Sequence, residues 1–182
     1  NEGTGDYTVR FIPTIGYEFT TQGVGADDLL NSDPDVNTGD VEVSFTGGEV
    51  ITGVDAGLVR STDPTLGTIS NFVWDDKNGN GLQDDNEPGI DNVELALMDP
   101  DSGEVLTTTT TSGGGFYSFR GLSAGDYIVE ITPAMGYDLS PAGVGADDAI
   151  DSDFDPDTLR LEVTLAEGQV ETNIDAGLSW RT

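Results

Sequence analysis

The chain contains no cysteine and no histidine, and Lys77 is its single lysine. Without cysteine there can be no disulfides, and zinc sites built on cysteine or histidine are excluded. A histidine general base and a Ser-His-Asp triad are excluded for the same reason. Serine and threonine are abundant but have no base to activate them, so we expect no enzymatic activity.

Basic residues are also scarce. Six Lys and Arg stand against 35 Asp and Glu, which gives a net charge of −29. Such a charge repels nucleic acids and anionic membrane surfaces, so neither is an expected partner. It suits a protein that binds divalent cations or must stay soluble outside a cell. Low hydrophobicity and high charge also favour disorder, but regular strand-like runs argue against disorder in an ion-loaded state.

Long apolar runs are missing too. No stretch of about 18 apolar residues occurs, so we expect no membrane insertion in this segment. No signal-peptide pattern opens the sequence, and we expect either a mature protein or an excerpt of a longer one. The expected location is extracellular, secreted or on a cell surface.

The segment 76–87 has the pattern of a twelve-residue calcium loop, D-x-[DN]-x-[DN]-G-x5-E. Gly81 stands at loop position 6, where the chain must turn sharply, and the carbonyl of Leu82 falls at position 7. Side chains with oxygen ligands fall at positions 1, 3, 5, 9 and 12, which are Asp76, Asn78, Asn80, Asp84 and Glu87.

Calcium is a hard ion that takes six to eight oxygen ligands, and a tight loop can point alternate side chains at one centre. The alternative is a solvated Asn/Gly/Asp turn, because these residues form turns in any case. Six constraints met in one register favour Ca2+, and the preceding strand pattern predicts such a loop without paired helices.

A second acidic cluster lies at 147–157 and contains no basic residue. Carboxylates this close repel one another and favour a bound cation. The predicted metal ligands are Asp147, Asp148, Asp151, Asp153 and Asp155. The first copy of the repeat described next keeps oxygen-bearing residues at the equivalent positions, Asp27, Asp28, Asn31, Asp33 and Asp35. The open alternatives are a site for one or two calcium ions and a solvated acidic loop.

The sequence repeats itself with an offset of 120 residues. Residues 5–58 match 125–178 without a gap, from Gly-Asp-Tyr to Asp-Ala-Gly-Leu, which indicates duplicated domains. Residues 61–182 are therefore expected to form a complete domain, and residues 1–60 the C-terminal half of another. Either the half-domain comes from a longer array of such units, or a neighbouring subunit donates the missing strands.

The complete domain is predicted to be all-β. Alternating or β-branched runs punctuated by turns indicate about seven strands, which suits a two-sheet sandwich. The expected strands cover 68–74, 93–98, 104–111, 116–120, 126–132, 159–165 and 170–174.

Several motifs together resemble one family. They are Phe-Val-Trp-Asp-Asp-Lys-Asn-Gly-Asn-Gly at 72–81, Pro-Gly-Ile at 88–90, Gly-Phe-Tyr-Ser-Phe at 115–119, Gly-Leu-Ser-Ala-Gly-Asp-Tyr at 121–127 and Ile-Asp-Ala-Gly at 174–177. These motifs are similar to the B-type repeat domains of serine-aspartate repeat (SdrD-like) surface proteins, relatives of collagen-adhesin B-type (Cna-B) modules. The resemblance covers 67–178, and again 5–58.

That resemblance implies tandem immunoglobulin-like β-sandwich domains with calcium-binding loops, used as a stalk on a bacterial surface. It assigns calcium to the loop 76–87. Many collagen-adhesin modules carry a Lys–Asn isopeptide bond in the core, but here the one lysine, Lys77, stands inside the acidic loop. With neither disulfide nor isopeptide expected, calcium is the remaining cross-link.

The leading hypothesis is a structural spacer that calcium stiffens, with neighbouring repeats or subunits of the same protein as partners. The alternatives are a filament subunit and a module that recognises a host or matrix protein or a glycan. Recognition would need exposed aromatic side chains, and the candidates are Tyr17, Tyr137, Tyr117 and Trp180. The acid pair Asp147/Asp148 does not suit a glycosidase, whose two carboxyls face each other across a cleft.

Overall fold

The structure is a computed structural model that describes residues 4–24, 31–48 and 50–181. The chain divides into two compact units, Asn1–Thr62 and Asp63–Thr182. All regular elements in the described residues are strands, so the fold is all-β as the sequence predicted. None of those residues belongs to a helix that could cross a membrane.

In unit 63–182 the first sheet is organised around β5 (Gly67–Asp75), its longest strand. This strand pairs antiparallel with β8 (Phe116–Leu122) and parallel with β12 (Val170–Glu171) and β13 (Ala176–Trp180). The three-residue β10 (Tyr137–Leu139) extends the sheet beyond β13. Strands from both ends of the unit therefore meet on β5.

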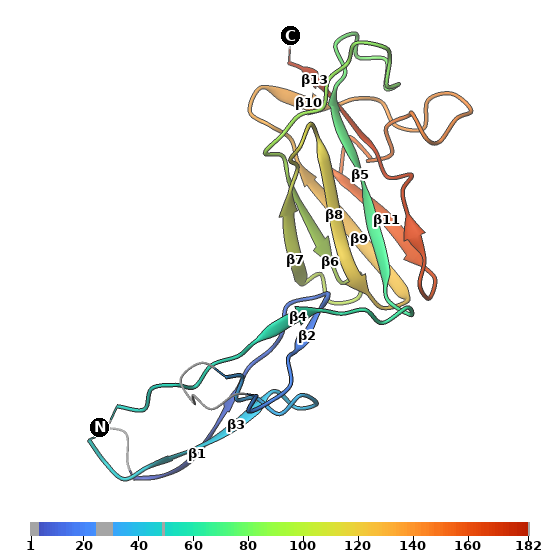
Figure 1. Ribbon diagram of the computed structural model, residues 1–182. Coiled ribbons are helices and arrows are strands. Elements are labelled where there is room, and N and C mark those ends of the chain that lie inside the picture. Colours follow the sequence, from blue (N-terminus) through green and yellow to red (C-terminus); the bar gives the residue numbers. More distant parts are fainter. Residues whose placement is uncertain (1–3, 25–30, 49, 182) are drawn as a thin grey trace. The chain divides into compact units, whose positions relative to one another are not determined.

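The second sheet has the order β11-β9-β6-β7, and each of its pairs is antiparallel. The two sheets lie face to face as two layers (Figure 1). The strands of the second sheet are β6 (Glu94–Met98), β7 (Val105–Thr110), β9 (Gly125–Thr132) and β11 (Arg160–Leu165).

The core of this unit lies between the two sheets. Alternate residues of each strand point the same way, so β6 buries Leu95 and Leu97 while β9 buries Val129 and Ile131. Trp74, near the end of β5, is fully buried, with its ring packed against Gly177 of β13.

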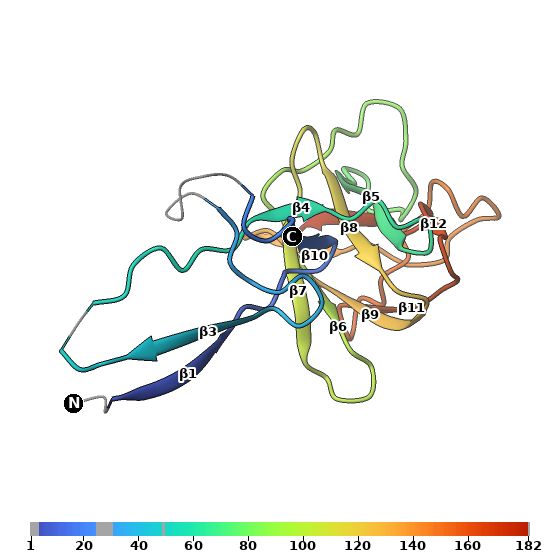
Figure 2. The same ribbon diagram turned by 60° about the horizontal axis from the view of Figure 1, so that its bottom comes forward.

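The described part of unit 1–62 contains four strands in two separate pairs. Figure 2 shows β1 (Gly5–Arg10) and β3 (Asp40–Phe45) as a two-stranded antiparallel ribbon. The second pair is formed by β2 (Tyr17–Phe19) and β4 (Leu58–Arg60). Both pairs have the register of β9–β11 and β10–β13 shifted by 120 residues.

The strand prediction needs two corrections in residues 63–181, where the structure has nine strands rather than about seven. The strands β10 and β13 were not predicted, because Tyr137–Leu139 is short and Ala176–Trp180 contains glycine and shows no alternation. The run expected over 170–174 forms only the two-residue strand β12.

Candidate metal centre

The predicted calcium loop begins directly after β5, with Asp76 as its first residue. Asp76 is buried, and its amide donates to the carbonyl of Leu178 at 2.9 Å, which joins the loop to β13. Its carboxylate accepts hydrogen bonds from the amides of Gly79, Asn80 and Gly81 at 2.7, 3.2 and 2.8 Å. The loop is therefore wrapped around the carboxylate at position 1.

The other predicted side chains gather in the same loop. The side-chain Nδ2 atoms of Asn78 and Asn80 both donate to Oδ2 of Asp84, at 2.7 and 2.9 Å. Glu87 closes the loop, since its carboxylate accepts from the amides of Lys77 at 2.9 Å and Asp84 at 3.1 Å. Five oxygen-bearing side chains thus line one short turn.

Gly81 stands where the loop turns back. Its φ of 79° lies in the left-handed region, and a Cβ there would collide with the carbonyl oxygen of Pro141. Glycine is therefore required both by the backbone conformation and by the close approach of the 141–153 segment.

That segment is hydrogen-bonded to the loop. The amide of Gln83 donates to the carbonyl of Ile150 at 2.7 Å, and the amide of Ser152 donates to the carbonyl of Gly81 at 3.0 Å. Leu82 and Asp151 form an isolated antiparallel bridge. Both loops lie at the same end of the sandwich (Figure 1), so the predicted calcium loop and the second acidic cluster are neighbours.

Three of the predicted carboxylates in the second cluster lie together. Asp148, Asp151 and Asp153 each place a carboxylate oxygen so that the three lie within 4.8 Å of one another. Two oxygens bound to one calcium ion at about 2.4 Å can be at most about 4.8 Å apart. The group is thus compact enough for one ion.

Asp175 lies beside this group, and we did not predict it. It precedes β13 and is 2% exposed, and its amide donates to Oδ2 of Asp153 at 2.5 Å. A single acid between Ile174 and Ala176 gave no sign of metal binding. The signal available in the sequence was its match with Asp55, 120 residues earlier.

Burial and mutual repulsion raise the pKa of two of these carboxyls. The pKa of Asp175 rises to about 8, chiefly because the group is buried and then because Asp153, Asp151 and Asp148 are near. Burial likewise raises the pKa of Asp153 to about 6, although the hydrogen bond from Asp175 opposes that rise. The site disfavours its own negative charge in the absence of a cation.

Two oxygens in or beside the group have no hydrogen-bond donor, Oδ1 of Asp151 and Oδ2 of Asp175, and both are fully buried. A buried carboxylate oxygen without a partner is costly, and buried polar atoms are nearly always paired. A hard divalent cation bound by the group would satisfy Oδ1 of Asp151 and relieve the repulsion that the three carboxylates exert on one another and on Asp175. The residues therefore fit calcium, which takes only oxygen ligands.

The structure does not bring every predicted ligand into the group. The carboxylate of Asp155 accepts from the amides of Asp157 and Thr158 at 2.7 and 3.1 Å, which closes a turn instead. Asp147 is exposed and accepts from the amide of Ala149 at 3.3 Å.

In the first copy, Asp27 and Asp28 lie outside the described residues. Asn31 is half-buried. Asp33 repeats the contact made by Asp153, since its Oδ2 accepts from the amide of Asp55 at 2.5 Å. Asp35 repeats the turn of Asp155, with amide donors at Asn37 and Thr38 that lower the pKa of its carboxyl.

The aromatic residues considered for ligand recognition are placed differently. Tyr117 is 4% exposed and its hydroxyl donates to the carbonyl of Ile174, so the expectation of an exposed platform there is wrong. Trp180 is 64% exposed, but its ring stacks on Tyr137 with the centroids 4.7 Å apart.

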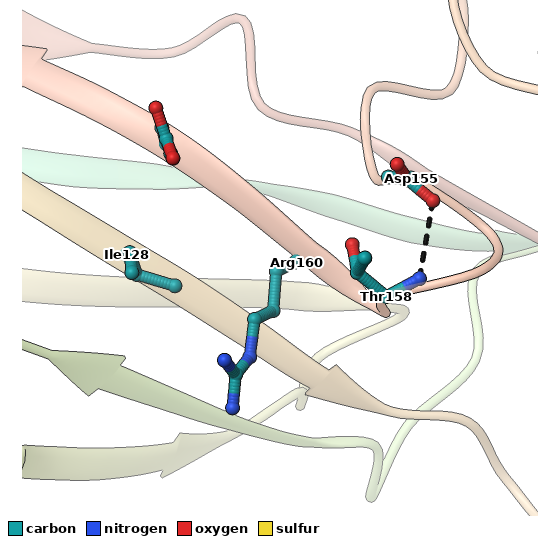
Figure 3. Close-up of a pocket in the computed structure, with 5 residues that line it drawn as sticks. Ile128, Asp155, Thr158 and Arg160 are labelled. Atoms are coloured by element: carbon teal, nitrogen blue, oxygen red, sulfur yellow. Dashed lines mark hydrogen bonds between the residues drawn. The ribbon is translucent and has the colours of Figure 1, made fainter. Parts of the chain in front are cut away.

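An open pocket of about 610 Å³ lies at the sandwich surface around β9 and β11 (Figure 3), lined by Ile128, Asp155, Thr158, Arg160 and Glu162. Two of its three charged groups are already engaged, since the Asp155 carboxylate accepts from the amide of Thr158 and Arg160 pairs with Glu130. The pocket therefore offers no free charged group of its own for a ligand beyond Glu162.

The fold and the loops define an all-β sandwich repeat domain with acidic loops at one end. Residues 67–178 match the family model described as SdrD B-like domain, and the chain belongs to this family. The resemblance drawn from the sequence motifs is confirmed.

Two relatives support the assignment. The chain is 36% identical over 148 residues to serine-aspartate repeat-containing protein F of Staphylococcus epidermidis, and 38% identical over 148 residues to protein D of Staphylococcus aureus strain Newman. Each alignment covers 81% of this chain, but only 8% and 11% of those relatives.

Among solved structures, a minor pilin of Streptococcus agalactiae is 12% identical with a TM-score of 0.43, over 98% of this chain and 84% of that one. A similarity of this size carries no argument, and the assignment rests on the sequence relatives.

Proposed function

We propose that this chain is a calcium-stiffened spacer in a secreted or cell-surface bacterial repeat protein, without enzymatic activity. The observation that carries the proposal is the pair of buried carboxylate oxygens, from Asp151 and Asp175, that have no hydrogen-bond donor. The family assignment and the net charge of −29 support it. Neighbouring repeats or subunits of the same protein are the expected partners.

The residues that would hold calcium join distant parts of the unit. Asp76 follows β5, Asp151 and Asp153 lie between β10 and β11, and Asp175 precedes β13. Calcium bound in the loop 76–87 and in the second group would hold each of these segments at its own site. The Leu82–Asp151 bridge then links the loop 76–87 to the second group, so both sites hold the same end of the sandwich.

Thermal unfolding in calcium and in chelator tests the proposal. A ligand that binds only the folded state at a hundredfold excess over its Kd stabilises it by about 2.7 kcal/mol. For a domain of this size that corresponds to a rise in Tm of roughly 10 °C per ion. Magnesium should give a smaller rise, because it demands stricter geometry and retains its waters.

The variant Asp151→Asn should lose part of the calcium-dependent rise. The matched control Asp101→Asn changes an exposed acid in the turn between β6 and β7, and should keep all of it. An equal Tm in calcium and in chelator would contradict the proposal.

We infer further that residues 1–60 are the C-terminal half of a second B-type repeat. The strands of this unit correspond to β9, β10, β11 and β13 by the offset of 120. Its described residues contain no counterpart of β5 to β8. Val9 and Leu58 are 40% and 42% exposed, whereas their equivalents Val129 and Leu178 are fully buried, so strands of that kind would cover apolar side chains that this unit leaves exposed.

A fusion that places residues 63–124 in front of Gly5, in place of residues 1–4, tests this inference. The amides of β1 and β3 should then exchange hydrogen slowly, at rates close to those expected for β9 and β11. A flexible Gly/Ser segment of equal length is the control and should give no protection. Equal exchange in both fusions would refute the half-domain, whereas protection in the unfused chain that grows with concentration would indicate strands donated by a second copy.

A further inference from the structure

The two repeats share a cross-strand ion pair of opposite polarity. In β1–β3, Arg10 is the register partner of Asp40, with its Nε and a terminal nitrogen at 2.6 and 2.8 Å from the two carboxylate oxygens. In β9–β11, the partners at the equivalent position are Glu130 and Arg160, whose Nε lies 2.6 Å from Oε2. The basic residue has changed strands.

The other positions of the two ladders carry residues of the same kind, except that Thr8 donates to Glu42 whereas Ile128 stands opposite Glu162. Asp6 faces Ser44 and Asp126 faces Thr164, with a hydroxyl donating to the carboxylate at 2.6 Å in both copies. The apolar positions also match, since a tyrosine faces a valine in each ladder. Strand β1 could therefore pair with β11, and β9 with β3, at little steric cost.

The charged position opposes that exchange. With β1 on β11, Arg10 would face Arg160, and with β9 on β3, Glu130 would face Asp40. Like charges directly opposite each other on a sheet are destabilising, whereas opposite charges are favourable. Both incorrect pairings therefore carry a repulsive contact that both correct pairings lack.

The placement of two scarce basic residues at this one ladder position needs a reason other than stability. The chain has six basic residues, and two of them occupy this one ladder position. Exposed ion pairs add little to folding stability, so stability alone is a weak reason for that use. Arg160 lies on the open face of β11, where Figure 3 shows it beside Ile128 of the neighbouring strand.

We propose that the inverted ion pair determines which strands pair. It would make β1 select β3, and β9 select β11, within the same repeat. It would also disfavour pairing with the equivalent strand of the other repeat or of a second copy of the chain. Duplicated sequences are prone to domain swapping and misassembly. Proteins distinguish a correct from an incorrect partner in part by repulsive contacts that arise only with the incorrect one.

The double variant Arg10→Glu with Asp40→Arg tests this proposal. It keeps an attractive pair in unit 1–62 and leaves the net charge unchanged, but gives both repeats the same polarity. The quadruple variant that adds Glu130→Arg and Arg160→Glu restores opposite polarity. Because the chain has no cysteine, a disulfide between two introduced cysteines identifies which strands have paired. Thr8→Cys with Glu42→Cys detects the correct ladder, and Thr8→Cys with Glu162→Cys detects the exchanged one.

After refolding and oxidation, the ratio of exchanged to correct cross-links should rise about fivefold in the double variant and return to the wild-type value in the quadruple variant. High salt should raise the ratio in the wild type, because it screens exposed charges. Equal ratios in all three proteins would overturn the proposal. So would a double variant that loses the correct cross-link without gaining the exchanged one.

Discussion

The two units contain the same strand pairs in different surroundings. Val9 and Val129 stand at equivalent positions, yet Val9 is 40% exposed and Val129 is fully buried. Leu58 and Leu178 differ in the same way, at 42% and 0%. The strands β1 and β3 thus pair without any counterpart of β5 to β8. Burial of the apolar side chains on these strands does require such strands, which only unit 63–182 has among the described residues.

The acidic groups follow the same comparison. The contact between Asp33 and Asp55 repeats that between Asp153 and Asp175, with amide-to-carboxylate distances of 2.5 Å in both. The unit 1–62 has no counterpart of the loop 76–87, however, since the matched repeat begins only at residue 5. The contact between Asp33 and Asp55 therefore forms without a calcium loop of that kind in its own unit.

The largest expected difference concerns the leucine pair. Leu178→Ala should destabilise unit 63–182 by about 2–5 kcal/mol, because it leaves a cavity in the core where this β13 side chain is fully buried. Leu58→Ala removes an exposed side chain and should change that unfolding transition by less than about 0.5 kcal/mol. Chemical denaturation in calcium measures both, and equal effects would contradict the difference in burial.

A smaller difference is expected for the aspartate pair. Asp175→Asn should lower the calcium-dependent stabilisation by about the contribution of one ion, roughly 2.7 kcal/mol at a hundredfold excess over Kd. In chelator the variant should be no less stable than the wild type, because it removes a buried carboxyl that has no donor. Asp55→Asn is the matched control for the transition of unit 63–182. A loss of stability in chelator as large as that in calcium would show that Asp175 acts through packing alone.

The sequence predicted the parts of the molecule that local pattern determines. The offset of 120 residues predicted a duplicated unit, and the ladders β1–β3 and β9–β11 do share one register. Alternation predicted the strands β6, β9 and β11. The loop 76–87 was identified by spacing alone, and its side chains do gather in one turn. Its calcium remains a prediction.

The parts that were missed depend on contacts between distant segments. The strand β13 is stabilised by parallel pairing with β5, about 100 residues away, and its own sequence carries no alternation. Asp175 becomes a site residue only because that pairing brings it to Asp153. Asp155 fits the alternating pattern of its cluster, but its carboxylate accepts hydrogen bonds from the amides of Asp157 and Thr158 and closes a turn instead. Spacing cannot distinguish these two uses of an aspartate.

The most direct test of the calcium clamp is hydrogen exchange at the amides that join the two loops. The amides of Gln83 and Ser152, which donate to Ile150 and Gly81, should exchange slowly in calcium and much faster in chelator. The amide of Phe11, which donates to Gly39 in the other unit, serves as the internal reference and should not respond. Equal exchange at Gln83 and Ser152 with and without calcium would contradict the account.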